Sequence, residues 1–378
     1  MRRTIQSVVV LATFAGVSLF AASRLPDTSA VGSWNAGAAA AYLDQRASWW
    51  MSWSAAARDH GTFCISCHTA MPYALSRPLL RSALGEQSPS ETERRLLGNV
   101  TKRVRLWKES KPYYENQARQ SRGTEAVLNA LILASSGARG TLSDDARAAF
   151  DNMWALQETS GPQKGAWPWI NFRNEPWEAD DSPFFGASLA AVAAGTAPQS
   201  YRSGLQIRTN LQLLREYLSR EYSKQALIQQ AVLLWASTKL PDLLSAEQQQ
   251  SIIGEVLKKQ RDDGGWSLSS VAWTWRETSL YSLAKLWVRS DASPLEAKSD
   301  GYATGLIALA LEQAGLSRQD PQLQRALAWL VRNQSKPDGR WSAYSLNRRH
   351  DGTSGTGLFM SDAATAFAVL ALTQSHDR

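Results

Sequence analysis

The chain has 378 residues, a formal net charge of +7 and 44% apolar residues, and it contains 16 tryptophans. This length and composition allow one large core, so a single α-rich domain is reasonable. Basic and acidic residues are interspersed along the chain, and no basic run is interleaved with aromatic residues, which excludes a nucleic-acid partner.

Residues 1–23 have the pattern of a secretion signal peptide. Arg2 and Arg3 form a positive start, an apolar stretch covers 8–20, and small residues at 21–23 precede a proline. The apolar stretch is too short to span a bilayer comfortably. We therefore predict export to the periplasm or a comparable extracytoplasmic compartment. An uncleaved signal is the alternative, and it is the only route to the membrane that we expect.

Both cysteines of the chain lie in one pentapeptide, Cys64-Ile65-Ser66-Cys67-His68. C-x-x-C-H is the attachment signature of a c-type haem: two thiols bond to the vinyl groups, and the histidine reaches the iron as proximal ligand. We predict one covalent haem c held by Cys64, Cys67 and His68, and with it a periplasmic redox partner. A local disulfide, a thioredoxin-type redox pair and another metal site are the alternatives.

Residues 34–378 are predicted to form one domain of six helical hairpins, with the haem in the first of them, at 60–80. In each hairpin an amphipathic outer helix precedes a nearly apolar inner helix that should be buried. The predicted pairs, outer then inner, are 36–53 with 68–80, 91–107 with 123–136, 142–157 with 184–194, 205–220 with 223–237, 244–260 with a helix from 299, and 320–334 with a helix from 361. A closed ring of such hairpins is an all-α fold, the α/α toroid; an open solenoid is the alternative.

Three of the outer helices end in a shared pattern of Gln, Gly and Trp. The segments are 157–167, 260–266 and 334–341, and each turn is followed by a polar residue that starts the next inner helix. This pattern resembles the QW repeats of squalene–hopene cyclases and prenyltransferase β subunits. The resemblance implies the α/α toroid, in which these glutamines and tryptophans stabilise the ring and perform no chemistry.

The first repeat has its haem motif where the fifth and sixth have their tryptophan turns, so we expect the haem at the mouth of the ring. Met360 directly precedes the last inner helix, which abuts the first repeat in a closed ring. We take Met360 as the tentative sixth ligand, with His350 or an open or water-bound site as alternatives. Arg348 and Arg349 would lie near the haem propionates, or simply in a solvated loop.

The segment Glu178-Ala179-Asp180-Asp181 is similar to the Asp-x-Asp-Asp motif of class II terpenoid cyclases. In those enzymes the middle Asp protonates an alkene or epoxide, so the resemblance implies Asp180 as proton donor with Asp181 beside it. Here Glu replaces the first Asp, and hopene-type cyclases have two toroids where this chain has one. The same residues would also serve as a plain helix cap.

Two functions of different classes follow from this sequence. The first, which the long apolar inner helices and the aromatic cluster favour, is a haem-dependent redox enzyme that acts on a hydrophobic, isoprenoid-like compound held by aromatic residues in the ring. The second is an electron-transfer or haem-binding module that uses the ring as a scaffold. A class II-like cyclase is a further alternative. Zinc-dependent prenyl transfer is excluded if haem is attached, because that family uses a cysteine ligand and none is left over.

Overall fold

The computed structural model describes residues 33–137, 140–273 and 280–373. The predicted signal peptide, residues 1–23, lies outside the described residues. Within them the chain forms fifteen α-helices and one two-stranded hairpin, which confirms the expected all-α class. None of the helices in these ranges is long and apolar enough to cross a membrane.

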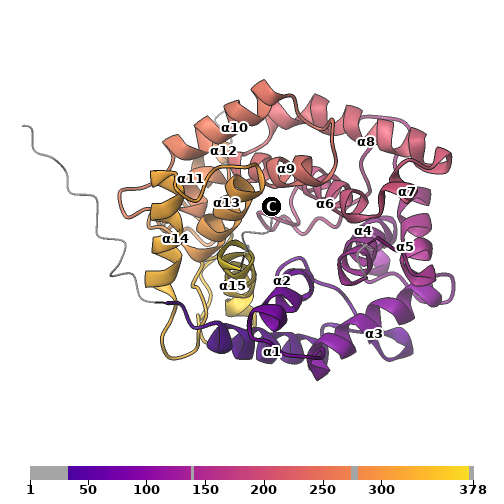
Figure 1. Cartoon of the computed structure of the whole chain (residues 1–378), viewed down its shortest axis with the longest axis horizontal. Coiled ribbons are helices and arrows are strands. Elements are labelled where there is room, and N and C mark those ends of the chain that lie inside the picture. The colour runs from indigo at the N-terminus through magenta and orange to yellow at the C-terminus, as the bar shows by residue number, and fades with distance from the viewer. Residues whose placement is uncertain (1–32, 138–139, 274–279, 374–378) are drawn as a thin grey trace, which may run out of the picture. The chain divides into compact units, whose positions relative to one another are not determined.

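Six helices form an inner series that closes on itself. They are α2 (Ala70–Ala83), α4 (Ala118–Ser136), α6 (Ser182–Thr196), α9 (Leu227–Lys239), α13 (Gly301–Gln313) and α15 (Phe359–Leu372). Each packs against the next, and the last, α15, packs against the first, α2 (Figure 1). Helices α6, α13 and α15 are buried along almost their whole length, because small and apolar side chains surround them on every side.

Six amphipathic helices lie outside this series (Figure 1). They are α1 (Ala36–Ser52), α3 (Glu91–Arg105), α5 (Asp144–Ala155), α8 (Arg208–Glu221), α10 (Ala246–Lys258) and α14 (Pro321–Asn333). The predicted order of outer and inner helices is therefore found, with one difference. Helices α5, α8 and α10 pack on the inner helix that precedes them in the chain, not on the one that follows. Long connections after α5 and α10 carry the chain onward to the next inner position.

The remaining elements are short. They are the strands β1 (Ala57–Arg58) and β2 (Thr62–Phe63) and the helices α7 (Gln199–Arg202), α11 (Leu268–Val271) and α12 (Leu280–Lys285). The two strands are antiparallel, with Ala57 opposite Phe63 and Arg58 opposite Thr62. This hairpin connects α1 to the pentapeptide that carries both cysteines.

Three glutamines tie each tryptophan turn to the next outer helix. The side-chain amides of Gln157, Gln260 and Gln334 donate to the glycine carbonyl of their own turn at 3.0, 2.9 and 2.8 Å. Each also donates to a backbone carbonyl at the start of the following outer helix. For Gln334 that carbonyl belongs to Asn35, the N-cap of α1, so the last turn of the chain is bound to the first helix.

The three tryptophans of these turns are fully buried. Trp167, Trp266 and Trp341 donate their indole N–H to main-chain carbonyls of the preceding outer helix at 2.6, 2.8 and 2.7 Å. Gly339 has a φ of +77°, and a Cβ there would lie 2.4 Å from the backbone of Ala38. The glutamines, tryptophans and glycines of the three turns thus hold neighbouring helices together.

Candidate functional site

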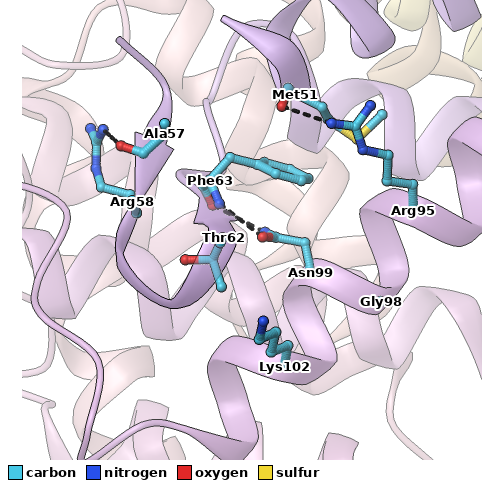
Figure 2. A pocket seen from close by; sticks show the side chains of 10 residues that line it. Met51, Ala57, Arg58, Thr62, Phe63, Arg95, Gly98, Asn99 and Lys102 are labelled. Atoms are coloured by element: carbon cyan, nitrogen blue, oxygen red, sulfur yellow. Dashed lines mark hydrogen bonds between the residues drawn. The ribbon is translucent and has the colours of Figure 1, made fainter. Parts of the chain in front are cut away.

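A short hairpin positions the pentapeptide. The chain turns at His60 and Gly61, which have φ values of +54° and +64°, and returns along β2 to Phe63. Asn99, on α3, holds Phe63 by both backbone groups: its Oδ1 accepts from the Phe63 N–H at 2.9 Å, and its Nδ2 donates to the Phe63 carbonyl at 3.0 Å (Figure 2). Cys64 follows directly, so its backbone is fixed from the α3 side.

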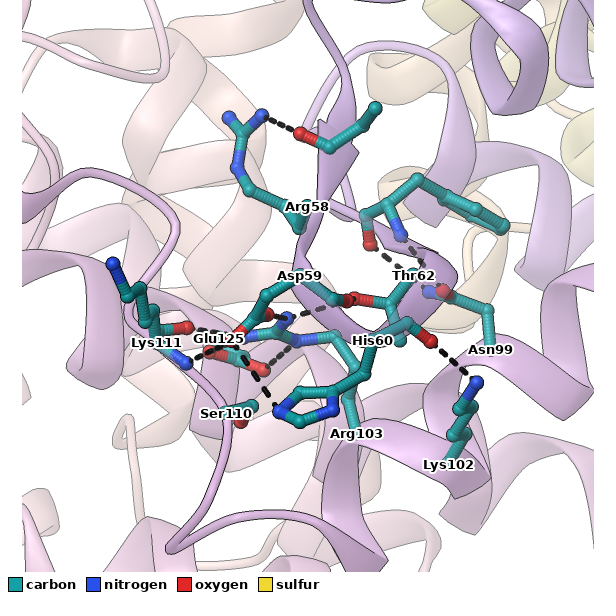
Figure 3. Close-up of polar contacts among 12 residues, drawn as sticks. Arg58, Asp59, His60, Thr62, Asn99, Lys102, Arg103, Ser110, Lys111 and Glu125 are labelled. Carbon is teal, nitrogen blue, oxygen red and sulfur yellow. Dashed lines mark hydrogen bonds and ion pairs between the residues drawn. The ribbon is translucent and has the colours of Figure 1, made fainter.

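A buried arginine of the same helix also fixes the hairpin (Figure 3). Arg103, on α3, is fully buried and pairs with the equally buried Glu125 of α4. It also donates to Thr62 Oγ1 at 2.9 Å and to Asp59 Oδ1 at 3.2 Å. Burial raises the pKa of Glu125, and the Arg103 guanidinium opposes that rise. Since Arg103 contacts the hairpin, α3 and α4 together, it locks the segment that precedes Cys64.

Ser66, inside the pentapeptide, accepts hydrogen bonds from the backbone at the start of the inner helix α2. Its hydroxyl accepts from the backbone N–H of Thr69 at 3.2 Å and of Ala70 at 3.0 Å, two donors of the first turn that lack helical partners. Helix α2 therefore begins immediately after the motif. His68 directly precedes Thr69, the N-cap of this helix.

Cys64 and Cys67 are free cysteines and both are buried, with exposures of 4% and 2%. Burial raises the pKa of Cys64 to about 11, an effect that the positive charge of Arg58 opposes. Burial and the negative charge of Glu178 raise the pKa of Cys67 further above its ordinary value. A thioredoxin-type pair needs an accessible thiol of lowered pKa, so these properties disfavour that alternative.

His68 is a neutral imidazole with one nitrogen already bound. Burial, together with the nearby positive charge of Arg46, lowers its pKa to about 3. Its Nδ1 lies 2.8 Å from Thr69 Oγ1, which leaves Nε2 for a metal. Phe359 stacks on the ring at 3.8 Å between centroids, and Trp50 meets it edge-on at 4.9 Å.

A buried carboxylate lies behind Thr69. Asp362, on α15, is 1% exposed and accepts four hydrogen bonds. They come from Thr69 Oγ1 at 2.7 Å, from Tyr42 Oη at 2.8 Å, and from Nε and Nη2 of Arg46 at 2.7 and 2.9 Å. Burial raises the pKa of Asp362, while the paired Arg46 guanidinium lowers it. This cluster joins α1, the start of α2 and α15.

The donor set fits a covalent haem c. Two thiols and one neutral imidazole come from a single pentapeptide, and Nδ1, the imidazole nitrogen that would not bind the iron, has Thr69 Oγ1 as its partner. Trp50, Trp177 and Phe359 surround His68 with aromatic surface, which suits an apolar porphyrin. The described residues contain no cluster of three or more His, Cys, Asp or Glu side chains that could hold a bare metal ion.

The other predicted haem contacts lie in the segment before and at the start of α15. Met360 is buried as the second residue of that helix, and its neighbour Phe359 is the residue that stacks on His68. Arg348 and Arg349 are exposed, and their backbone N–H groups donate to Ser345 Oγ and Asp291 Oδ2. Met360 as sixth ligand and the two arginines as propionate partners stay predictions.

The acidic segment at the start of α6 is divided between two places. Glu178 is partly buried, near enough to Cys64 and Cys67 to raise the pKa of both thiols. Asp180 is exposed and accepts a hydrogen bond from the Asn171 side-chain amide at 2.6 Å. Together with Asp181 it lines a cavity of about 400 Å³. Polar and charged side chains dominate that cavity: Gln163, Tyr217, Arg220, Glu221, Lys224 and Gln225.

Another cavity, of about 340 Å³, lies against the hairpin itself (Figure 2). Phe63, the residue before the first cysteine, lines it. Its three charged lining residues, Arg58, Arg95 and Lys102, are all basic. The sequence pattern did not indicate this cavity, because the cavity depends on how α3 packs against the hairpin.

Sequence reasoning missed the role of Asp362. The residues 361–366 suggested a polar cap at the start of the last inner helix, but α15 begins earlier, at Phe359, so Asp362 lies inside the first turn. Asp300, by contrast, is the expected N-cap and accepts from the N–H groups of Tyr302 and Ala303. One signal was available: Tyr42 and Arg46 are four residues apart, on one face of a helix that had to meet the last repeat.

Comparisons with known proteins give no family for this chain. No family model matches it, and no curated protein matches it. Among solved structures, two glycosidase variants align with 88% of this chain and 96% of their own at 13% identity, with TM-scores of 0.28 and 0.27. Similarity at that level carries no argument about the fold or the activity.

Proposed function

We propose that this protein is an exported c-type haem protein that transfers electrons, with one haem attached through Cys64 and Cys67 and bound by His68. One observation carries the proposal. The pentapeptide offers two free thiols and a neutral imidazole whose Nδ1 contacts Thr69 Oγ1, so Nε2 is the nitrogen available to iron. A bound haem c would supply reversible one-electron chemistry at its iron.

We also propose that the scaffold is a six-fold α/α toroid of the squalene–hopene cyclase and prenyltransferase kind. The closed series of inner helices supports this, with α15 packed on α2. The repeated bonds of Gln157, Gln260 and Gln334 support it independently, because the same side chain makes the same two contacts in three repeats. The toroid then serves to place the haem motif at its mouth.

The packing favours electron transfer over catalysis in the ring. Aromatic side chains that would line a substrate cavity are used in the core: Trp167, Phe184 and Phe185 are at most 1% exposed. Trp177 donates its indole N–H to Tyr302 Oη at 2.8 Å, which links the loop before α6 to α13. Polar and charged side chains dominate the cavity beside Asp180, and three basic side chains line the cavity beside Phe63, so neither has the mainly apolar lining that would favour an isoprenoid chain.

A haem-dependent redox enzyme acting on a hydrophobic compound is the second candidate. Glu178 favours this candidate. Burial raises the pKa of Glu178 to about 7, and the negative charge of Glu178 raises the pKa of both thiols. A carboxyl group that titrates near neutrality beside an iron site can hold or release a proton for a bound substrate. For a cyclase, the exposed Asp180 offers no comparable apolar setting.

Spectroscopy of the protein matured with a c-type haem assembly system tests the proposal. An electron carrier is expected to give a low-spin spectrum that carbon monoxide does not change, and to exchange electrons rapidly with small redox mediators. Rapid carbon monoxide binding to a high-spin iron would instead support the enzyme. Preparations with no haem absorbance, under conditions in which a control cytochrome c is matured, would contradict both.

A further inference from the structure

We infer that Asp362, acting through the hydroxyl of Thr69, is the positioning residue for the proximal ligand His68, and that this relay exists only when the last helix has closed on the first. The inference rests on the proposed function, since it concerns how the chain presents His68 to an iron. The contacts of the relay are made by protein atoms alone.

The hydrogen-bond directions follow from the donors around Asp362. Two of its four partners are guanidinium N–H groups of Arg46, which can only donate, and the carboxylate can only accept from them. Thr69 Oγ1 donates to Asp362 Oδ2 at 2.7 Å, so the single hydroxyl proton of Thr69 is used there. At the 2.8 Å contact with His68, Thr69 must therefore accept, and the proton lies on Nδ1 of the imidazole.

This chain of donors fixes one tautomer. With Nδ1 protonated, the lone pair of His68 is on Nε2, the nitrogen that a haem iron would need. A hydrogen bond from Nδ1–H toward a carboxylate also makes the imidazole a stronger electron donor to a metal. The anionic end of the relay should therefore stabilise the oxidised iron and lower the reduction potential.

The relay depends on ring closure because its members come from opposite ends of the chain. Arg46 and Tyr42 lie on α1, Thr69 at the start of α2, and Asp362 on α15, 293 residues after Thr69. Arg46 Nη2 donates in addition to the carbonyl of Gly355 at 2.6 Å, in the segment before α15. A chain in which α15 has not docked has no partner for Thr69, and His68 loses its fixed tautomer.

The first experiment needs no haem. In the full chain with Cys64→Ala and Cys67→Ala, selective ¹⁵N-histidine labelling gives four histidines to resolve, and His68→Asn assigns the relevant one. The expected result is a single Nδ1–H tautomer at position 68. Thr69→Val, which keeps the shape and the Arg46–Asp362 pair, should give a mixture of tautomers, and Thr69→Ser should restore the single form. A proton found on Nε2, or a spectrum indifferent to Thr69→Val, overturns the inference.

The second experiment uses the haem-loaded protein and measures its midpoint potential. Thr69→Val should shift the potential to a more positive value, Asp362→Asn should shift it in the same direction, and Thr69→Ser should return it toward the unmodified protein. Circular dichroism identifies a variant that has failed to fold; Thr69→Val then decides the question without Asp362→Asn. Potentials unchanged in folded variants overturn the inference. If no haem is attached at all, the proposed function fails, while the tautomer measurement still decides on the relay.

Discussion

Gln334 and Asn35 bind each other twice although 299 residues separate them. The side-chain amide of Gln334 donates to the Asn35 carbonyl at 2.9 Å, and the Asn35 N–H donates to Gln334 Oε1 at 2.7 Å. A third bond ties Gln334 to the carbonyl of Gly339. The last outer helix is thereby fastened to the first, at the place where the series of hairpins closes.

Replacing this glutamine should weaken the closure. Gln334→Ala removes three partly exposed hydrogen bonds, and we expect a loss of about 1–3 kcal/mol in the free energy of unfolding, measured by urea denaturation. The matched control is Gln324→Ala on α14, the helix that Gln334 ends; the Gln324 side chain donates to exposed Gln319 Oε1 at 3.3 Å, and its loss should cost about 0.5 kcal/mol or less. Equal losses for the two variants would mean that the closure contact contributes nothing.

The buried pair Arg103–Glu125 should be intolerant of losing one member. Glu125→Gln removes the buried one of the two carboxylates that pair with the Arg103 guanidinium and leaves it only the partly buried Asp59; removing one member of a buried pair typically costs about 3–5 kcal/mol. Arg103 also donates to Thr62 and Asp59 in the hairpin before Cys64, so the amount of covalent haem per protein should fall together with the stability. Arg105→Ala, which breaks the exposed pair with Asp145, is the control and should change stability by less than about 1 kcal/mol. A stable, fully loaded Glu125→Gln protein would contradict this account of the hairpin.

Glu178 should make stability fall as the pH rises. Its pKa is raised from 4.5 to about 7 in the folded chain, with burial as the cause, so the folded state binds a proton more tightly than the unfolded state does. Its contribution is fully present below about pH 4.5 and is lost as the pH rises toward 7. The free energy of unfolding of Glu178→Gln, relative to that of the parent chain, should therefore be about 1–3 kcal/mol higher at pH 8 than at pH 4.

Unfolding of the cysteine-free protein at several pH values measures this difference. Glu255→Gln is the control, because Glu255 is exposed on α10 beside Lys258. A Glu178→Gln variant whose stability difference from the parent chain is the same at pH 4 and pH 8 would show that Glu178 is solvated in the folded protein.

The thiols should be unreactive in the folded chain before haem is attached. A pKa raised from 9.0 to about 11 at Cys64 lowers its thiolate fraction at pH 8 by about 100-fold, and burial slows access further. Alkylation by iodoacetamide, monitored by mass spectrometry, should therefore be at least about 100-fold slower in the folded chain than in denaturant. Rapid alkylation of the folded chain would instead indicate an accessible redox pair of the thioredoxin type.

The order of helices was predictable from the sequence because local patterns determine it. Apolar runs such as 184–194 and the turns at 260–266 and 334–341 depend on residues close together in the chain. The partners of each outer helix were less predictable: α5, α8 and α10 pack on the preceding inner helix, since connection lengths and packing decide between two neighbours.

The pentapeptide was recognisable for the same local reason, but its surroundings were not. Asp362 resembled a helix cap, and only the docking of α15 on α2 brings it to Thr69. Arg103 was one basic residue among several on an amphipathic helix until α4 placed Glu125 beside it. Glu178 and Asp180 belong to one motif in the sequence, yet they face different surroundings, because the loop before α6 turns between them.

The central claim is that Cys64 and Cys67 carry a covalent haem, and the intact mass of the exported protein tests it most directly. Matured with a c-type haem assembly system and then denatured, the protein is expected to retain the mass of one haem, and the Cys64→Ala, Cys67→Ala variant to lack it. A wild-type chain of unmodified mass, from cells that load a control cytochrome c, would contradict the account.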